Sequence, residues 1–204
     1  MELISIHPDN PQERMIKKAL KHLVTESGIA IYPTDTVYGI GGCASHHKAL
    51  NKISAFMKKD KARKFSFLCS SFAQASKYVK ISDKNYKLMK HYLPGPYTFI
   101  LPATKLVPKK ICPKRQTVGI RIPDSNVCRA LVEGAGEPIA NTSLGIPSEH
   151  RGNPDEIIEK TWEDVDCIIE CGPLDNPSGS TIVDLTKNRP EILRQGIGEF
   201  NEQL

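Results

Sequence analysis

Small polar residues that follow a short apolar run form the first candidate site in this sequence. The segment Thr34–Thr36 reads Thr-Asp-Thr and comes directly after the β-prone run Ile29–Tyr32 and the strand-ending Pro33. Its hydroxyl and carboxylate groups can reach a small ligand at the end of a strand, where α/β sheets place their sites. The glycine-rich segment Gly39–Gly42 is expected to turn tightly and to approach that ligand. The alternative is an ordinary turn whose residues stabilise only the local structure and bind no ligand.

Similar polar residues recur at the ends of other predicted strands. Taken singly, each is more often a satisfied turn residue than a ligand contact. Taken together they predict a groove of hydroxyl groups with two arginines, which bind phosphates and carboxylates in a bidentate way. The set consists of Thr34, Thr36, Thr98, Arg121, Asn141, Thr142, Ser143, the segment Ser178–Thr181 with Ser180, and Arg194.

Basic residues cluster in two segments of a mildly basic chain, in which 28 Lys and Arg stand against 23 Asp and Glu. The first cluster is made of Lys58, Lys59, Lys61, Arg63 and Lys64, and the second lies within residues 105–115. Such runs are usually solvated faces. The functional alternative is a positive surface for a ligand that carries phosphate groups.

The composition is typical of a globular protein of one-domain size. No apolar run is long enough to cross a bilayer, and the N-terminus does not resemble a signal peptide, so we expect a cytoplasmic protein without membrane association. The six cysteines show no CxxC pair and no zinc-ligand spacing, which predicts buried free thiols and no metal site.

Helical and strand patterns interleave along the chain, which predicts an α/β fold with one twisted, mixed sheet in a single domain over residues 1–204. Consecutive strands near the C-terminus favour antiparallel pairing there. Helices are expected at about 10–27, 46–57, 71–79, 83–93, 126–133 and from 153 onward. Strands are expected at 29–33, 65–68, 97–101, 117–122, 138–142, 165–170, 181–185 and 191–194.

Several common catalytic motifs are absent from the sequence. There is no GxxxxGK[ST] phosphate loop, no GxSxG nucleophile elbow and no HExxH zinc motif. Residues 39–44 fit GxGxxA, but five residues separate Gly39 from the preceding strand run, so we interpret this match as chance. The sequence therefore excludes a P-loop enzyme.

A set of longer motifs resembles the Sua5/YrdC/YciO family over nearly the whole chain, and is closest to its YciO branch. The matching segments are YPTDTVYGIG, FSFLC after the first basic cluster, LPGPYTFIL, VGIRIP, EPIANTSLG, STIVDL and LRQGIGE. The resemblance implies a YrdC-like twisted open sheet with flanking helices around a basic cavity. It also implies synthesis of L-threonylcarbamoyladenylate from threonine, bicarbonate and ATP with Mg²⁺, which feeds N6-threonylcarbamoyladenosine formation in tRNA.

The resemblance also implies roles for individual residues. Thr34 would help to hold the threonine, and Lys58, Lys59 and Arg63 would act as catalytic cations that meet its carboxylate and the phosphates. Thr36, Thr98 and Arg121 join the substrate site. The nucleotide contacts would come from Thr142, Ser143, Ser180 and Arg194.

Two aligned positions differ from the synthase branch of that family. Its Lys-x-Arg motif aligns with Met57 and Lys59, and the asparagine of its Ser-x-Asn motif aligns with Gly145. Turnover is therefore expected to be weaker in this branch. The alternative is a module that binds a nucleotide or double-stranded RNA without efficient turnover, since the resemblance also implies binding of double-stranded RNA.

Overall fold

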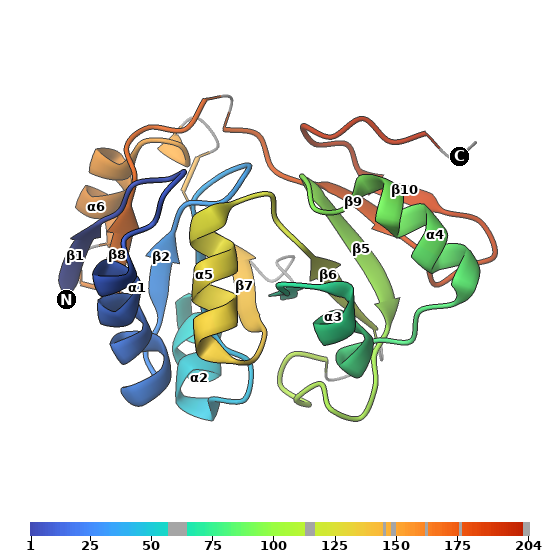
Figure 1. The fold of residues 1–204 in the computed structure, drawn as a ribbon, viewed down its shortest axis with the longest axis horizontal. Helices are drawn as coiled ribbons and strands as arrows, with labels where there is room; N and C mark the ends of the chain where they lie inside the picture. Colours follow the sequence, from blue (N-terminus) through green and yellow to red (C-terminus); the bar gives the residue numbers. More distant parts are fainter. Residues whose placement is uncertain are drawn as a thin grey trace.

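The computed structural model describes residues 1–56, 65–112, 117–144, 146–147, 150–161, 163–175 and 177–201. It is a mixed α/β fold around one twisted, open sheet of ten strands in the order β1-β8-β2-β3-β7-β4-β6-β5-β9-β10. β1 and β10 lie at opposite ends of the molecule (Figure 1). The α/β class and the mixed sheet predicted from the interleaved patterns are confirmed.

The strands are β1 (Glu2–Ser5), β2 (Ala30–Tyr32), β3 (Gly39–Cys43), β4 (Ser66–Leu68), β5 (Tyr97–Pro102), β6 (Thr117–Arg121), β7 (Ile139–Ser143), β8 (Cys167–Glu170), β9 (Thr181–Asp184) and β10 (Glu191–Arg194). The α-helices are α1 (Glu13–Leu20), α2 (His47–Phe56), α3 (Phe72–Tyr78), α4 (Asp83–Tyr92), α5 (Asn126–Ala135) and α6 (Pro154–Thr161). A π-helical turn at Lys21–Thr25 continues α1. None of the described helices has the length and apolar character that spanning a bilayer requires.

The strands near the C-terminus only partly follow the expected order. β9 and β10 are antiparallel neighbours, as predicted. β8 is not beside β9, because it pairs in parallel with β1 and β2 at the far end of the sheet. One of those partners, β1, was not predicted from the sequence. Parallel neighbours cannot be joined by a short hairpin, so β1 and β8 come from distant parts of the chain.

Two helix ends differ from the prediction. α1 begins at Glu13 with Gln12 as the N-cap residue, which makes no side-chain capping bond, so Asn10 does not cap it. α5 runs through Gly134 and ends at Ala135, and its C-cap residue is Gly136, whose left-handed backbone (φ 70°) suits glycine. A Cβ at Gly134 would collide with Leu20, which shows that this glycine allows α5 to approach α1.

The glycine-rich segment does not form the expected tight turn. Gly39–Cys43 is strand β3, paired antiparallel with both β2 and β7. A Cβ at Gly39 would lie 2.5 Å from Oδ1 of Asn141, and one at Gly41 would collide with the hydroxyl of Tyr32. These glycines therefore make room for two side chains of the protein itself.

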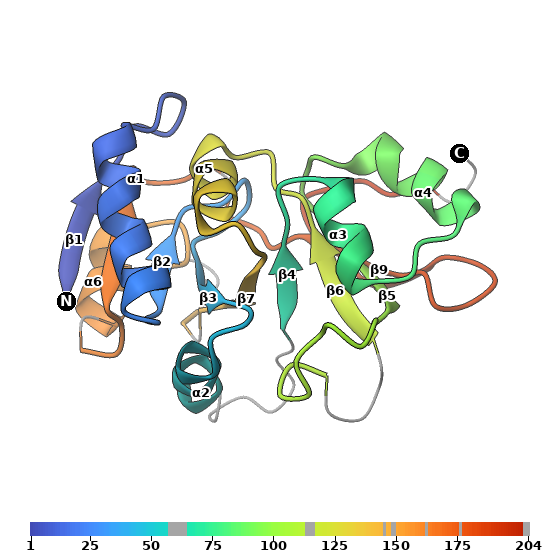
Figure 2. The ribbon, with the colours of Figure 1, turned by 60° about the horizontal axis from the view of Figure 1, so that its bottom comes forward.

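The apolar core shows which part of the sheet each helix covers. α1 and α5 pack with Leu68 and Ile139, whereas α3 and α4 pack with Phe67, Phe99 and Ile120. Side chains alternate between the faces of a strand, so these two groups lie on opposite faces. In Figure 2, β4 lies between the α5 side and the α3 side of the molecule.

One part of the sheet surface remains outside the apolar clusters of the described chain. On β4, β6, β5 and β9, the face opposite Phe67 carries Ser66, Gly119, Thr98 and Ile182. None of these residues belongs to the three clusters of buried apolar side chains. This uncovered half of one face is where the polar residues gather.

Candidate functional site

A row of polar side chains crosses the sheet on this face, and we call it the polar row. Its members, in order from β2 to β10, are Tyr32, Asn141, Ser66, Thr98, Ser180 and Arg194. Gly119 occupies the gap between Ser66 and Thr98, since a Cβ there would lie 3.2 Å from the Ser66 Cβ and 2.9 Å from the Thr98 Cγ2. The strand register explains the row, because Asn141 is opposite Ser66 and Ser66 is opposite Gly119.

The Arg194 end of the row is a connected set of hydrogen bonds. The hydroxyls of Thr98 and Ser180 are 2.8 Å apart. Arg194 donates from Nε and Nη2 to the Ser180 carbonyl at 3.1 and 2.7 Å, and from Nη2 to the Ser180 hydroxyl at 3.3 Å. Although Arg194 is an exposed residue, its guanidinium lies against the backbone of Gly179 and Ser180. The structure thus brings together three predicted site residues.

The Thr34–Thr36 turn forms a second set, around Arg121. Nη2 of Arg121 donates to the hydroxyl of Thr36 at 2.7 Å and of Thr34 at 3.2 Å, and forms an ion pair with Asp35. The Thr34 hydroxyl in turn donates to the Val37 carbonyl at 2.6 Å. Arg121 is 4 % exposed, and its Nε has no hydrogen-bond partner among the described residues. The hydroxyl of Thr34 is therefore already engaged within the turn.

Three arginines act on one another across this region. Desolvation, followed by the like charges of Arg121 and Arg151, lowers the pKa of the Arg194 guanidinium from its ordinary value. An arginine remains charged even so. Arg151 itself donates from Nε to the carbonyl of Ile146 at 2.9 Å. The combined positive field suits a ligand with more than one negative group.

The EPIANTSLG segment contributes residues to both faces of the sheet. Asn141 and Ser143 alternate with Thr142 along β7, so Asn141 and Ser143 lie on the face of the polar row and Thr142 lies on the other. The sequence reasoning grouped Asn141 with the other polar strand residues but gave it no specific role. An amide directly after the apolar pair Ile139 and Ala140 of a predicted strand is the signal that could have singled it out.

The predicted catalytic cations fall outside this description. Lys58, Lys59 and Arg63, together with Met57 and Gly145, are not among the described residues. Their roles remain predictions.

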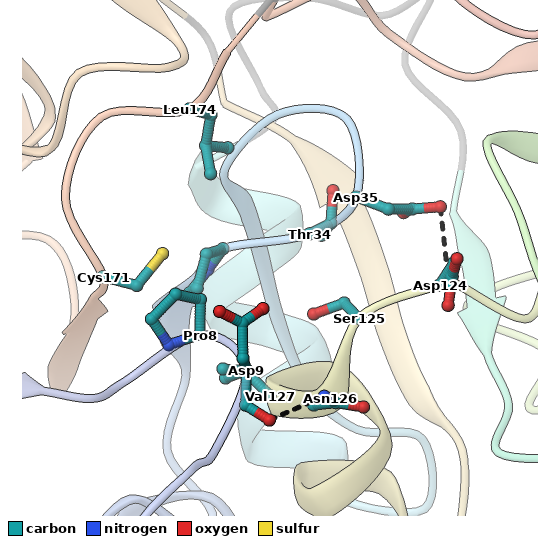
Figure 3. A pocket seen from close by; sticks show the side chains of 11 residues that line it. Pro8, Asp9, Thr34, Asp35, Asp124, Ser125, Asn126, Val127, Cys171 and Leu174 are labelled. Atoms are coloured by element: carbon teal, nitrogen blue, oxygen red, sulfur yellow. Dashed lines mark hydrogen bonds between the residues drawn. The ribbon is translucent and has the colours of Figure 1, made fainter.

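A separate pocket of about 300 Å³ opens beside the Thr34–Asp35 segment (Figure 3). Asp9, Asp35 and Asp124 contribute carboxylates to its lining, and no lysine or arginine of the described part of the chain lines it. Oδ2 of Asp35 accepts from the backbone N–H of Asp124 at 3.1 Å, drawn as a dashed line in Figure 3. This pocket is therefore not the basic cavity that the resemblance implies.

The described residues offer no obvious place for a resident metal ion. No group of three or more His, Cys, Asp or Glu side chains in the described part of the chain has the arrangement to hold one. The carboxylate of Asp35 is paired with Arg121. The cysteines are free thiols, and burial raises the pKa of Cys69 and Cys128 to about 12, so both are protonated at neutral pH.

Comparison with known proteins identifies relatives along the whole length of the chain. The crystal structure of E. coli YciO is 35% identical, covers 98% of each chain and superposes with a TM-score of 0.90. The crystal structure of P. abyssi Sua5 complexed with L-threonine is 28% identical and gives a TM-score of 0.84, over 96% of this chain and 58% of that one.

Sequence relatives include proteins named for an activity. The threonylcarbamoyl-AMP synthase of Pyrococcus abyssi is 30% identical over 177 residues, which cover 85% of this chain and 52% of the synthase. This chain therefore spans about half the length of that relative. A family model for Sua5, YciO and YrdC, described as telomere recombination, matches residues 22–196. With this match across most of its length, the chain belongs to the Sua5/YciO/YrdC family.

Proposed function

We propose that this chain is an ATP-dependent enzyme resembling L-threonylcarbamoyladenylate synthases, which converts threonine, bicarbonate and ATP into threonylcarbamoyl-AMP and pyrophosphate. The product would feed N6-threonylcarbamoyladenosine formation in tRNA. Relatives named threonylcarbamoyl-AMP synthase support this class of reaction. The observation that carries the proposal is the polar row, with Arg194 at one end and with Arg121 on β6, on the same face of the sheet.

The reaction places modest demands on the protein. The threonine amine and bicarbonate form a carbamate with loss of water. A carbamate oxygen then forms a bond to the α-phosphorus of ATP, while the bond from that phosphorus to the bridging oxygen breaks and pyrophosphate leaves. Positioning the reactants and neutralising the phosphate charge provide most of the catalysis in such a transfer. Mg²⁺ would enter bound to the phosphates of ATP, as part of the substrate.

The described residues divide these tasks between two arginines. Arg194 has no ion-pair partner within the described residues, so its charge is available to a phosphate group. Arg121, on β6, retains Nε as a donor for one more acceptor, such as a ligand carboxylate oxygen. Lys58, Lys59 and Arg63 would supply further positive charge.

The test is a measurement of pyrophosphate release together with the mass of the product. Release should require threonine, bicarbonate and ATP together, and the product should have the mass of threonylcarbamoyl-AMP. Arg194→Lys should reduce the rate, whereas Arg129→Lys, an exposed arginine on α5, should leave it unchanged. Release that is independent of threonine would refute the proposal.

Binding without turnover would instead support the module for a nucleotide or double-stranded RNA. In that case ATP and RNA would bind with no pyrophosphate formed. The affinity for RNA should then fall steeply with salt, because phosphate contacts displace counterions.

A further inference from the structure

The chain turns back directly after β10, and one buried hydroxyl holds this turn, which consists of residues 195–198. The hydroxyl belongs to Thr181, which is fully buried at the start of β9. It accepts from the backbone N–H of Gly196 at 3.0 Å and from the Gln195 amide at 3.4 Å, and donates to the Gly198 carbonyl at 2.5 Å. A hydroxyl has one donor and two acceptor positions, so its whole hydrogen-bonding capacity is used by the turn.

The same turn lies against the backbone that Arg194 binds. The backbone N–H of Ile197 donates to the Gly179 carbonyl at 3.1 Å. A Cβ at Gly196 would collide with the carbonyls of Gly179 and Ser180. A Cβ at Gly179 would lie 2.9 Å from Nη2 of Arg194. The turn after β10, the segment before β9 and the guanidinium are therefore packed closely together.

This packing fixes one edge of the Arg194 guanidinium and leaves the rest available. Nε and Nη2 both donate to the Ser180 carbonyl, at 3.1 and 2.7 Å. The two N–H groups of Nη1 have no hydrogen-bond partner within the residues that the structure describes. They are the donors that remain for a ligand.

Thr181 itself lies on the wrong face of the sheet to contact that ligand. Side chains alternate along β9, so Thr181 shares its face with Val183, a member of the apolar cluster that packs with α3 and α4. Ile182 lies on the opposite face, which is the face of the polar row. Any effect of the Thr181 hydroxyl on ligand binding must therefore pass through the turn that it holds.

We propose that the Thr181 hydroxyl and the Gln195 amide are positioning groups, which hold Arg194 so that Nη1 stays free to bind a phosphate group. This inference rests on the proposed function, in which Arg194 meets the nucleotide. Without the hydroxyl, the Gly196 N–H and the Gly198 carbonyl lose their partners, and the turn must move to find others. The residue just before the turn then loses its fixed direction, to which a planar guanidinium is sensitive.

The test measures AMP binding by calorimetry, in variants whose folding is checked by circular dichroism. Thr181→Val keeps the shape but removes the hydroxyl, and should weaken AMP binding about tenfold. Thr181→Ser keeps the donor and both acceptor positions, and its AMP affinity should stay within about threefold of the wild type. Gln195→Met, at an exposed residue, removes only the amide and should weaken AMP binding about threefold. It provides the decision if Thr181→Val does not fold.

A combined variant separates a positioning role from a merely structural one. Because Thr181 acts through the guanidinium, Thr181→Val should add little to the loss of AMP affinity that Arg194→Lys causes alone. The matched control is Thr161→Val on α6, where a buried threonine hydroxyl donates to the Ile157 carbonyl at 2.6 Å. It should leave AMP affinity unchanged.

Three results would overturn the inference. The first is full additivity of the losses in the combined variant, which would show that Thr181 acts independently of the guanidinium. The second is wild-type AMP affinity in folded Thr181→Val and Gln195→Met. The third is equal AMP affinity of the wild type and Arg194→Lys, because Thr181 would then have no ligand-binding group to orient.

Turnover of the wild type separates this inference from the proposed function. A wild type that binds AMP but releases no pyrophosphate with threonine refutes synthase activity, and the variants still decide the role of Thr181. A wild type that releases pyrophosphate, with an AMP affinity that survives Thr181→Val and Gln195→Met, refutes the inference alone. A wild type that binds no AMP refutes the inference as well.

Discussion

Arg121 and Arg194 belong to different strands of the candidate site, β6 and β10, and the protein holds them in different ways. Arg121 is buried on a central strand, where one nitrogen bonds two threonine hydroxyls and the Asp35 carboxylate. Arg194 is an exposed residue on the edge strand β10, and donates to the carbonyl and hydroxyl of Ser180. The charge of Arg121 is thus compensated within the protein, whereas no carboxylate of the described residues pairs with Arg194. The first arginine serves the fold as well as the site, and the second is available mainly to a ligand.

The largest expected effect distinguishes the two arginines by their contribution to stability. Arg121→Met should lower the free energy of unfolding by about 3–5 kcal/mol, because it leaves the Asp35 carboxylate buried without its partner. Urea denaturation followed by circular dichroism measures this loss. The double variant Asp35→Asn with Arg121→Met should recover part of it. A loss below about 1 kcal/mol in the single variant would show that Arg121 does not stabilise the fold.

A second change asks whether the Tyr32 end of the polar row is as tightly fixed as Arg121. Gly41→Ala would force its Cβ against the Tyr32 hydroxyl and the Ala140 carbonyl, so unfolding should become easier by about 1–3 kcal/mol. Thermal denaturation provides the measurement. In a Tyr32→Phe background the same change should be less costly, because one of the colliding atoms is gone. Equal costs in both backgrounds would contradict the proposed collision.

A third change isolates the Arg194 end. Arg194→Lys keeps the charge but removes the planar guanidinium, which can donate two hydrogen bonds to one phosphate. AMP should therefore bind about tenfold more weakly, while the melting temperature of the variant stays within about 1 °C of the wild type. Calorimetric titration gives the affinity, and Arg129→Lys is the control. Equal affinities for wild type and Arg194→Lys would remove this arginine from the nucleotide site.

The smallest effect concerns the hydroxyl pair beside Arg194. Thr98→Val keeps the shape but removes the 2.8 Å hydrogen bond to Ser180, which should lower stability by about 1 kcal/mol. AMP affinity should fall by less than in Arg194→Lys, because Ser180 still accepts from Arg194. A larger fall in affinity than for Arg194→Lys would make Thr98 a direct ligand contact.

Local sequence patterns determined most of the elements of this fold. The alternation of apolar residues in segments such as YTFIL and TVGIR identified β5 and β6 because a strand exposes successive side chains to opposite faces. Proline and an acidic first turn marked the start of α6 for a similarly local reason. These signals depend on neighbours in the chain, so one sequence is enough to detect them.

The sequence also provided the types of the site residues, but the strand register decided which of them meet. Thr98, Ser180 and Arg194 were predicted together and are bonded together, whereas Thr142 lies on the other face from Asn141. The prediction that Gly39 and Gly41 form a tight turn was wrong. They leave space in strand β3 for side chains of β2 and β7, which the local sequence does not reveal. Contacts between strands far apart in sequence leave no periodic signal in one chain. The pairing of Tyr32 with Asn141, 109 positions apart, was therefore decided only by the tertiary structure.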